Sequence, residues 1–109
     1  MKQYEIRWAN LGAQVGRRPV MLLTRSEASR YLNKLIAVEI TTTVRGIPQE
    51  IQLGRKEGLR ASCVANFDNL HVVNKASLGD LLGRLGPSRE VEAKRALGYA
   101  LGWAELKAL

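Results

Sequence analysis

The chain is poor in the residues that build disulfides and metal sites: its 109 residues include one cysteine, Cys63, and one histidine, His71. A lone cysteine excludes an internal disulfide, and one cysteine with one histidine excludes a metal site of the Cys/His type. The single histidine also excludes a ribonuclease mechanism that needs two. No apolar run approaches the roughly 18 residues of a membrane-spanning helix, so no such helix is predicted.

Several enzyme signatures are missing as well. There is no Gly-x-Ser-x-Gly elbow and no Gly-x-x-x-x-Gly-Lys-Ser/Thr loop, which argues against a serine hydrolase and a P-loop nucleotide hydrolase. The 10 acidic residues are scattered singly, which gives little support to a metal-dependent nuclease. His71 lies in an apolar stretch, 70–73, where a structural role is favoured. The opening residues turn polar too soon for a secretory leader, so we expect a cytoplasmic protein. Because the metal-binding and nucleotide-binding motifs are missing, we expect no metal and no cofactor.

Positive charge is what the chain has in excess. It carries 17 Lys and Arg against 10 Asp and Glu, a formal charge of +7. Residues 1–75 hold 12 of these bases and 6 of the acids, so most of the excess lies in the first two-thirds. Such a field predicts RNA, DNA or an acidic protein segment as the partner, with solubility alone as the alternative explanation.

The hydrophobic pattern predicts one domain over residues 1–109, of mixed β/α class. Alternation and β-branched runs favour short strands, and Pro19 fits the first position of its strand because proline lacks a ladder donor. We expect strands over 4–9, 19–23, 35–42, 50–53, 61–65 and 70–73.

Three helical segments complete the pattern. A brief helix over 26–32 is expected with Thr24 or Ser26 as its cap, and one or two helical turns over 77–82. The tail, 89–109, has Ser88 as a good N-cap and an apolar stripe of Val91, Leu97, Leu101 and several alanines. Many short strands followed by a terminal helix predict a small, strongly bent sheet or barrel with that helix packed on it.

Two segments carry the most suggestive chemistry. Residues 16–23 place Arg17 and Arg18 before an apolar strand, and residues 38–43 end another strand in threonines. RNA can be cut by its own 2′-hydroxyl if a protein orients the attack and stabilises the charge on the phosphoryl oxygens. An arginine fork and a threonine hydroxyl suit that task. Taken singly, a solvated arginine pair and an ordinary β-branched strand end explain the same residues.

Several segments in order resemble the MazF/PemK-type toxins, the endoribonuclease half of a toxin–antitoxin pair. The resemblance runs from about Tyr4 to about Leu101. Each motif alone is weak, but the ordered set is fairly specific. The matching segments are 4–11, 16–20, 40–42, 46–53, 58–64 and 75–78.

The resemblance implies a compact SH3-like barrel of the CcdB/PemK type that forms a homodimer. It implies cleavage of single-stranded RNA at short sequences, without a metal, and neutralisation by an acidic antitoxin. By position in the motifs, Arg18 and Thr41 take the catalytic roles, with Arg17 as the substitute if the register is off by one and Thr42 as an accessory neighbour.

The chain departs from the family pattern in the loop before Arg17. That loop is several residues shorter, and the glutamate that the family carries there has no counterpart. Glu39 is a candidate replacement for the general base, because a period of two puts it on the same strand face as Thr41. The alternative is that Glu39 merely pairs with Arg18 or a neighbour.

Further RNA contacts are predicted from residue type alone. Cationic side chains would follow the RNA backbone and aromatic side chains would stack on unpaired bases, with core or dimer packing as the alternative for any one aromatic. The cations are Arg25, Arg45, Arg55, Lys56 and Lys75, and the aromatics are Trp8, Phe67 and Tyr31.

Two alternative functions stay open on the same fold. One is gyrase poisoning by binding, as in the CcdB branch, against which the Arg18 and Thr41 pairing and the lack of a C-terminal aromatic ending both argue. The other is a non-catalytic RNA or partner binder, which the shortened loop would permit.

Overall fold

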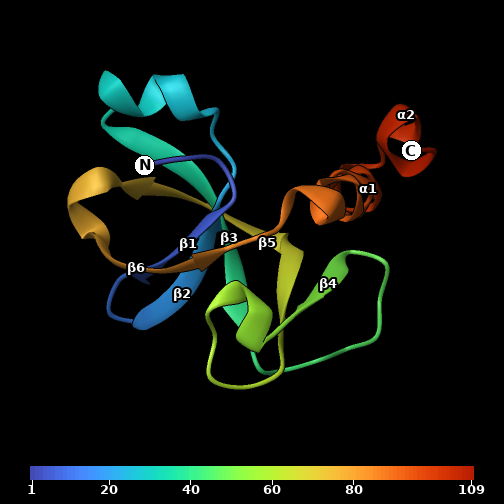
Figure 1. The fold of residues 1–109 in the computed structure, drawn as a ribbon, viewed down its shortest axis with the longest axis horizontal. Coiled ribbons are helices and arrows are strands. Elements are labelled where there is room, and N and C mark those ends of the chain that lie inside the picture. Colours follow the sequence, from blue (N-terminus) through green and yellow to red (C-terminus); the bar gives the residue numbers. More distant parts are fainter.

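A six-stranded antiparallel sheet with the strand order β4-β5-β3-β2-β1-β6 forms the body of the protein (Figure 1). The computed structural model describes all 109 residues. The strands are β1 Glu5–Asn10, β2 Arg17–Leu22, β3 Lys34–Thr41, β4 Glu50–Leu53, β5 Cys63–Asn74 and β6 Leu78–Arg84. Two α-helices, α1 Glu90–Leu101 and α2 Ala104–Lys107, and four 3₁₀ turns, η1 Ser26–Arg30, η2 Arg55–Glu57, η3 Lys75–Ser77 and η4 Pro87–Arg89, complete the chain.

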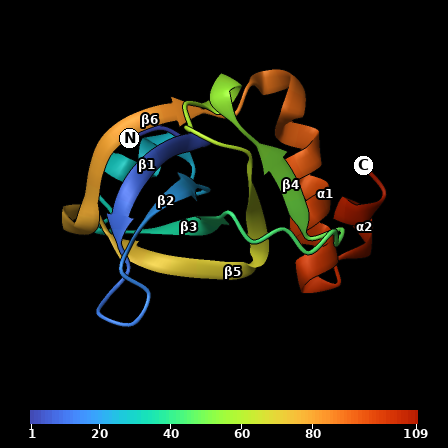
Figure 2. The same ribbon diagram turned by 90° about the horizontal axis from the view of Figure 1, so that it is seen from below.

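The sheet curls until its two edges nearly meet. The turn η2, which follows edge strand β4, packs on β6 at the other edge through Gly58 and Gly83. A Cβ atom on Gly58 would lie 1.9 Å from the Leu82 carbonyl oxygen, and one on Gly83 would lie 2.1 Å from that of Glu57. Because only glycine allows this approach, the two glycines close the curl into the half-barrel seen in Figure 2.

Alternation along the strands buries apolar side chains on both faces of the sheet. The larger cluster, of 14 buried residues, includes Ile6, Met21 and Phe67 and reaches Ala93 and Ala96 of α1, which lies beside β4 in Figure 2. The smaller cluster, of 6 residues, lies on the opposite face. Burial on both faces holds the central strands firmly, and they are the strands that position the site described below. No helix is long and apolar enough to cross a bilayer.

The predicted mixed fold, a bent sheet with a C-terminal helix on it, is confirmed, but three predicted elements were wrong. The expected strands 61–65 and 70–73 are one strand, β5, in which Glu39 pairs with Asn66 and its neighbour Val38 pairs with Leu70. The residues between, 67–69, bulge out of the ladder, which made one strand look like two. The helical turns expected over 77–82 are instead η3 and strand β6, because pairing with β1 decides their conformation.

The predicted helix ends also needed correction. Thr24 and Ser26 cap no helix; their hydroxyl oxygens accept hydrogen bonds from the backbone N–H groups of Ile36 and Gln3. Ser88 makes no cap, since η4 leads into α1 there. The terminal helix breaks at Gly102, whose φ is 64°. On α1, Ala93 and Ala96 face the core, whereas Val91 and Leu101 of the predicted stripe are exposed.

Candidate active site

The site begins where strands β2 and β3 separate. Their ladder runs through Leu22–Ala37 and Met21–Val38 and ends at Val20–Glu39. Beyond that point β2 continues to pair with β1, and β3 with β5. Two more residues in the same register would set Arg18 opposite Thr41. The two side chains therefore flank the opening between the strands.

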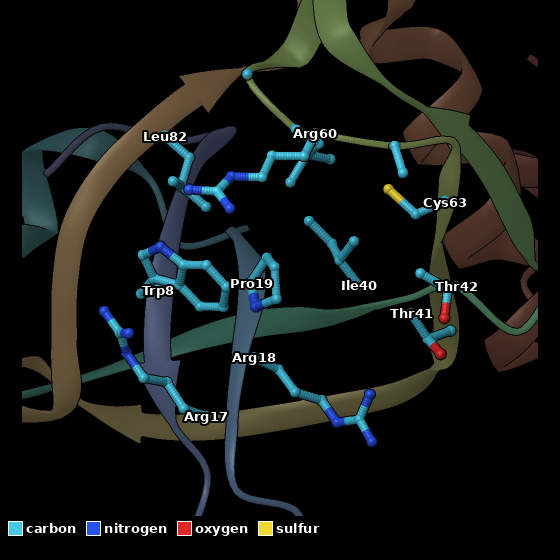
Figure 3. A pocket seen from close by; sticks show the side chains of 13 residues that line it. Trp8, Arg17, Arg18, Pro19, Ile40, Thr41, Thr42, Arg60, Cys63 and Leu82 are labelled. Atoms are coloured by element: carbon cyan, nitrogen blue, oxygen red, sulfur yellow. The ribbon is translucent and has the colours of Figure 1, made fainter.

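A pocket of about 430 Å³ occupies this opening (Figure 3), and we refer to it as the gap pocket. Its volume suits a ligand larger than a single phosphate, and its lining joins apolar and cationic side chains. The lining residues are Trp8, Arg17, Arg18, Pro19, Ile40, Thr41, Thr42, Gly58, Leu59, Arg60, Ala61, Cys63 and Leu82.

Arg17 and Arg18 leave β2 in different directions, as Figure 3 shows. The Arg17 guanidinium lies over the indole of Trp8, 4.6 Å from the ring centroid. Arg18 extends toward the side of the pocket that carries Thr41. The two neighbouring arginines thus serve opposite halves of the pocket, one against an aromatic surface and one against a hydroxyl.

Glu39 holds the Arg18 side chain from the strand side. Its Oε1 lies 3.2 Å from Arg18 Nε, and its side chain is 13% exposed against 42% for Arg18. The other carboxylate oxygen lies 3.8 Å from His71 Nε2. Glu39 does not line the gap pocket. This geometry corresponds to the ion-pair alternative, and the role of Glu39 as a general base stays a prediction without support from its position.

Thr41 is set up as a hydrogen-bond donor. Its Oγ1 accepts a hydrogen bond from the backbone N–H of Thr43 at 3.1 Å. The hydroxyl proton is therefore free to point elsewhere, and the side chain lines the gap pocket beside that of Thr42. A hydroxyl held in this way can donate to an oxygen of a ligand in the pocket.

The Cys63 thiol in the pocket wall is a weak nucleophile. Burial raises the pKa of the Cys63 thiol, and the nearby Glu57 carboxylate raises it further. A raised pKa keeps the thiol protonated at neutral pH, so Cys63 is a poor nucleophile there. No group of three or more His, Cys, Asp or Glu side chains gathers anywhere in the structure.

The predicted outer RNA contacts lie away from the pocket lining, with Trp8 as the exception. Phe67 is 1% exposed and belongs to the larger core cluster, so its prediction as a base-stacking residue was wrong. Tyr31 is exposed, and its hydroxyl accepts a hydrogen bond from Arg25. The Lys75 ammonium donates to the Ser29 carbonyl oxygen. The remaining three cations, Arg45, Arg55 and Lys56, are exposed outside the pocket.

Sequence reasoning missed Arg60, a cation of the pocket wall. It lies between η2 and β5, in a charged segment where no periodicity separates it from Arg55 or Lys56. Only the closure of the sheet, which brings η2 onto β6, carries Arg60 over the pocket. The missed apolar lining, Leu59 and Leu82, comes from the same closure.

The pocket combines three guanidinium groups, an indole face and two hydroxyls around one opening. Guanidinium groups match phosphate oxygens, and an aromatic face with apolar walls suits an unpaired base. The arrangement is therefore fitted to a nucleotide unit with its phosphate near Arg18 and Thr41 and its base near Trp8.

Comparison with known proteins gives consistent matches. Residues 2–101 match the family model described as PemK-like, MazF-like toxin of type II toxin–antitoxin system. A probable endoribonuclease MazF2 of Mycobacterium tuberculosis is 34% identical over 88 residues, which is 80% of this chain and 86% of that protein. The structure of the Mycobacterium tuberculosis toxin MazF-mt6 superposes with a TM-score of 0.85 at 33% identity, covering 90% of this chain and 96% of the other.

A further solved structure is an endoribonuclease in complex with its cognate antitoxin, from a mycobacterial species. It has a TM-score of 0.82 at 29% identity, covering 94% of this chain and 96% of the other. The likeness thus extends over nearly the whole chain and includes the strands that frame the gap pocket.

Proposed function

This chain belongs to the PemK-like, MazF-like toxins of type II toxin–antitoxin systems, and from that membership we propose that it is an endoribonuclease that cuts single-stranded RNA without a metal. The observation that supports this most directly is the position of Arg18 and Thr41. They flank one opening, in the register that the last β2–β3 pair sets.

The proposed reaction uses the 2′-hydroxyl of the RNA as the nucleophile. Its oxygen forms a bond to the adjacent phosphorus while the bond from phosphorus to the 5′-oxygen breaks. The 2′-hydroxyl loses one proton and the departing 5′-oxygen gains one, so the products are a 2′,3′-cyclic phosphate and a 5′-hydroxyl without net uptake or release of protons. No covalent bond to the protein is needed, so the protein contributes orientation and charge stabilisation.

Arg18 is the residue that we assign to the developing negative charge. Glu39 contacts its Nε side, which leaves the two terminal nitrogens for the non-bridging oxygens of the phosphate. A planar fork of this kind makes two parallel hydrogen bonds to such oxygens. Thr41 donates its free hydroxyl proton to a phosphoryl oxygen from the opposite side of the opening.

Trp8, Arg17 and Arg60 are assigned to binding rather than to bond cleavage. A base that stacks on Trp8 would take the place of the Arg17 guanidinium, which then turns to a neighbouring phosphate. Unpaired bases are required for such stacking, and this supports single-stranded RNA as the substrate.

An acidic antitoxin segment is the protein partner that the pocket favours. Three arginines line the gap pocket, and an acidic chain laid over them would compete directly with RNA phosphate. A mycobacterial relative has been solved in complex with its cognate antitoxin, which is consistent with this partner. We also propose a homodimer, as the family resemblance implies.

Cleavage of single-stranded RNA in the presence of EDTA tests the proposed function. We expect cutting in EDTA, cyclic-phosphate ends, and a rate about 10²–10³ lower in Arg18→Ala and in Thr41→Ala. Arg30→Ala is the matched control, since Arg30 is an exposed arginine outside the gap pocket and is not among the predicted RNA contacts. RNA binding without cutting by the native chain would favour the non-catalytic binder, and loss of gyrase activity with intact RNA would favour the CcdB-like alternative.

A further inference from the structure

The Glu39 carboxylate has a second neighbour that the proposed mechanism does not use. While its Oε1 faces Arg18 Nε at 3.2 Å, its Oε2 faces His71 Nε2 at 3.8 Å. Strand geometry explains the meeting: His71 pairs with Ala37 across β3–β5, and Glu39 follows Ala37 on the same face of β3. Arg18, Glu39 and His71 thus form a row across strands β2, β3 and β5.

The atoms at which the three side chains meet are shielded from water, although the Arg18 and His71 side chains are 42% and 27% exposed as a whole. The Glu39 side chain is 13% exposed, and the Arg18 Nε and His71 Nε2 atoms are buried without a hydrogen-bond partner. Buried nitrogen atoms of this kind are normally satisfied. The only carboxylate within ion-pair distance of both is that of Glu39. Glu39 is therefore the side chain whose two oxygens would serve both nitrogens after a small reorientation of the carboxylate.

We infer that His71 is a positioning residue for RNA cleavage, a role that rests on the proposed function. The imidazole, with its proton on Nε2, holds one oxygen of Glu39, and the other oxygen holds Arg18 by Nε. Arg18 then keeps its terminal nitrogens toward the gap pocket instead of turning back to the carboxylate. His71 touches neither RNA nor the reacting atoms, because it is outside the pocket lining.

The arrangement follows a known physical pattern. In metal sites, removal of the group that holds a ligand from behind commonly lowers activity about 10–100-fold, and we expect a loss of this order here because catalysis by positioning is equally sensitive to geometry. In this chain the group behind Arg18 is a carboxylate. A carboxylate that is mostly buried needs a partner for each oxygen, and the imidazole occupies the side that Arg18 leaves open.

Steady-state cleavage by two substitutions of His71 tests the inference. In His71→Leu the carboxylate loses its second partner, and we expect kcat to fall about 10–100-fold while KM changes less than about twofold. In His71→Gln the side-chain amide nitrogen replaces Nε2, and we expect kcat to recover to within about threefold of the native value. Val72→Ala, on the opposite face of β5 and 69% exposed, is the matched control.

Coupling to Glu39 separates positioning from a general structural effect. If His71 acts through Glu39, then His71→Leu added to Glu39→Gln produces little further loss of kcat. Because the chain has one histidine, the imidazole ¹⁵N signals belong to His71 alone, and Glu39→Gln should shift them strongly. Urea midpoints of all variants show whether each is folded under the assay conditions.

The outcomes distinguish the two proposals. Native protein that does not cut RNA overturns the proposed function and this role with it. Native protein that cuts, together with a His71→Leu variant of unchanged kcat, overturns the role of His71 alone. The role of His71 is also overturned if the losses of kcat from His71→Leu and Glu39→Gln multiply independently, or if the imidazole ¹⁵N signals do not shift in Glu39→Gln.

Discussion

Replacing Gly58 by alanine should damage both the stability and the RNA pocket of this protein. Gly58 ends η2 with a φ of 91°, a left-handed conformation that alanine adopts with difficulty. Its missing side chain is also the space into which β6 packs. An added Cβ would lie 1.9 Å from the Leu82 carbonyl oxygen, where ordinary contact begins near 3.4 Å.

The expected loss has two parts. Alanine in the left-handed region costs about 1–2 kcal/mol. The contact is with backbone rather than with a flexible side chain, so η2 or β6 must move by about 1.5 Å, and overpacking of this kind costs about 1–3 kcal/mol. After a small gain from the stiffer unfolded chain, we expect the free energy of unfolding to fall by about 2–4 kcal/mol.

Other glycines of the same chain separate the two parts. Gly46 has a φ of 70° but nothing within 4 Å of the position that a Cβ would take, so Gly46→Ala should show the backbone part alone, about 1–2 kcal/mol. Gly83 is outside the left-handed region but would meet the Glu57 carbonyl oxygen at 2.1 Å, so Gly83→Ala should show the contact part alone. Gly54, at a φ of −169° with open space around it, should tolerate alanine.

Urea unfolding and RNA cleavage, measured on all four variants, test this reasoning. Leu59 and Arg60 line the pocket directly after Gly58, so Gly58→Ala should also lower kcat/KM in urea-free conditions where the variant is still folded. If Gly58→Ala destabilises no more than Gly46→Ala, or if Gly83→Ala is harmless, the close approach of η2 and β6 does not hold the half-barrel together.

Three further predictions concern charge and recognition. The Arg89 hydrogen bond holds the pKa of the Glu92 carboxyl below its usual range, so the stabilisation is present at neutral pH and is lost as pH falls through the lowered pKa. Glu92→Gln should therefore flatten the acid side of a plot of urea midpoint against pH. An unchanged acid side would contradict the pairing. Arg60→Ala should reduce the salt dependence of RNA binding by about 0.7 in the slope of log K against log salt, measured by anisotropy with 2′-deoxy-substituted RNA; an unchanged slope would place Arg60 away from phosphate. In a Trp103→Phe background Trp8 is the single tryptophan, and its emission should change when the same RNA binds; constant emission would argue against base stacking on Trp8.

Much of the sheet was predictable because local pattern and final environment agree. The strand around Leu35–Thr42 is β-branched and buried at its centre. Pro19 was expected at the first position of its strand but is the third residue of β2, where it pairs with Trp8 of β1 beyond the last β2–β3 pair. Strand β6 was not predictable in the same way. Its sequence, with Gly79 and Gly83, has weak strand preference, and its conformation comes from pairing with β1, which is far away in the chain.

The candidate site was likewise predictable only in part. The segments that carry Arg18 and Thr41 could be picked out because cations and hydroxyls at strand ends are visible in the sequence. The register that sets the two residues opposite each other depends on the Val20–Glu39 pair, which no local pattern specifies. The same is true of His71, whose apolar neighbours indicated a structural role and whose approach to Glu39 depends on the Ala37–His71 pair between β3 and β5.

Beyond the Val20–Glu39 pair, the separation of β2 from β3 gives the gap pocket two sides that different ladders support. One side, with Trp8 and Arg17, is braced by the β1–β2 ladder; the other, with Thr41, is braced by the β3–β5 ladder. In the proposed binding mode, we expect substitutions on the first side to change which base is accepted while the Thr41 hydroxyl on the second side stays in place. Base preference and cleavage rate would then respond to different substitutions.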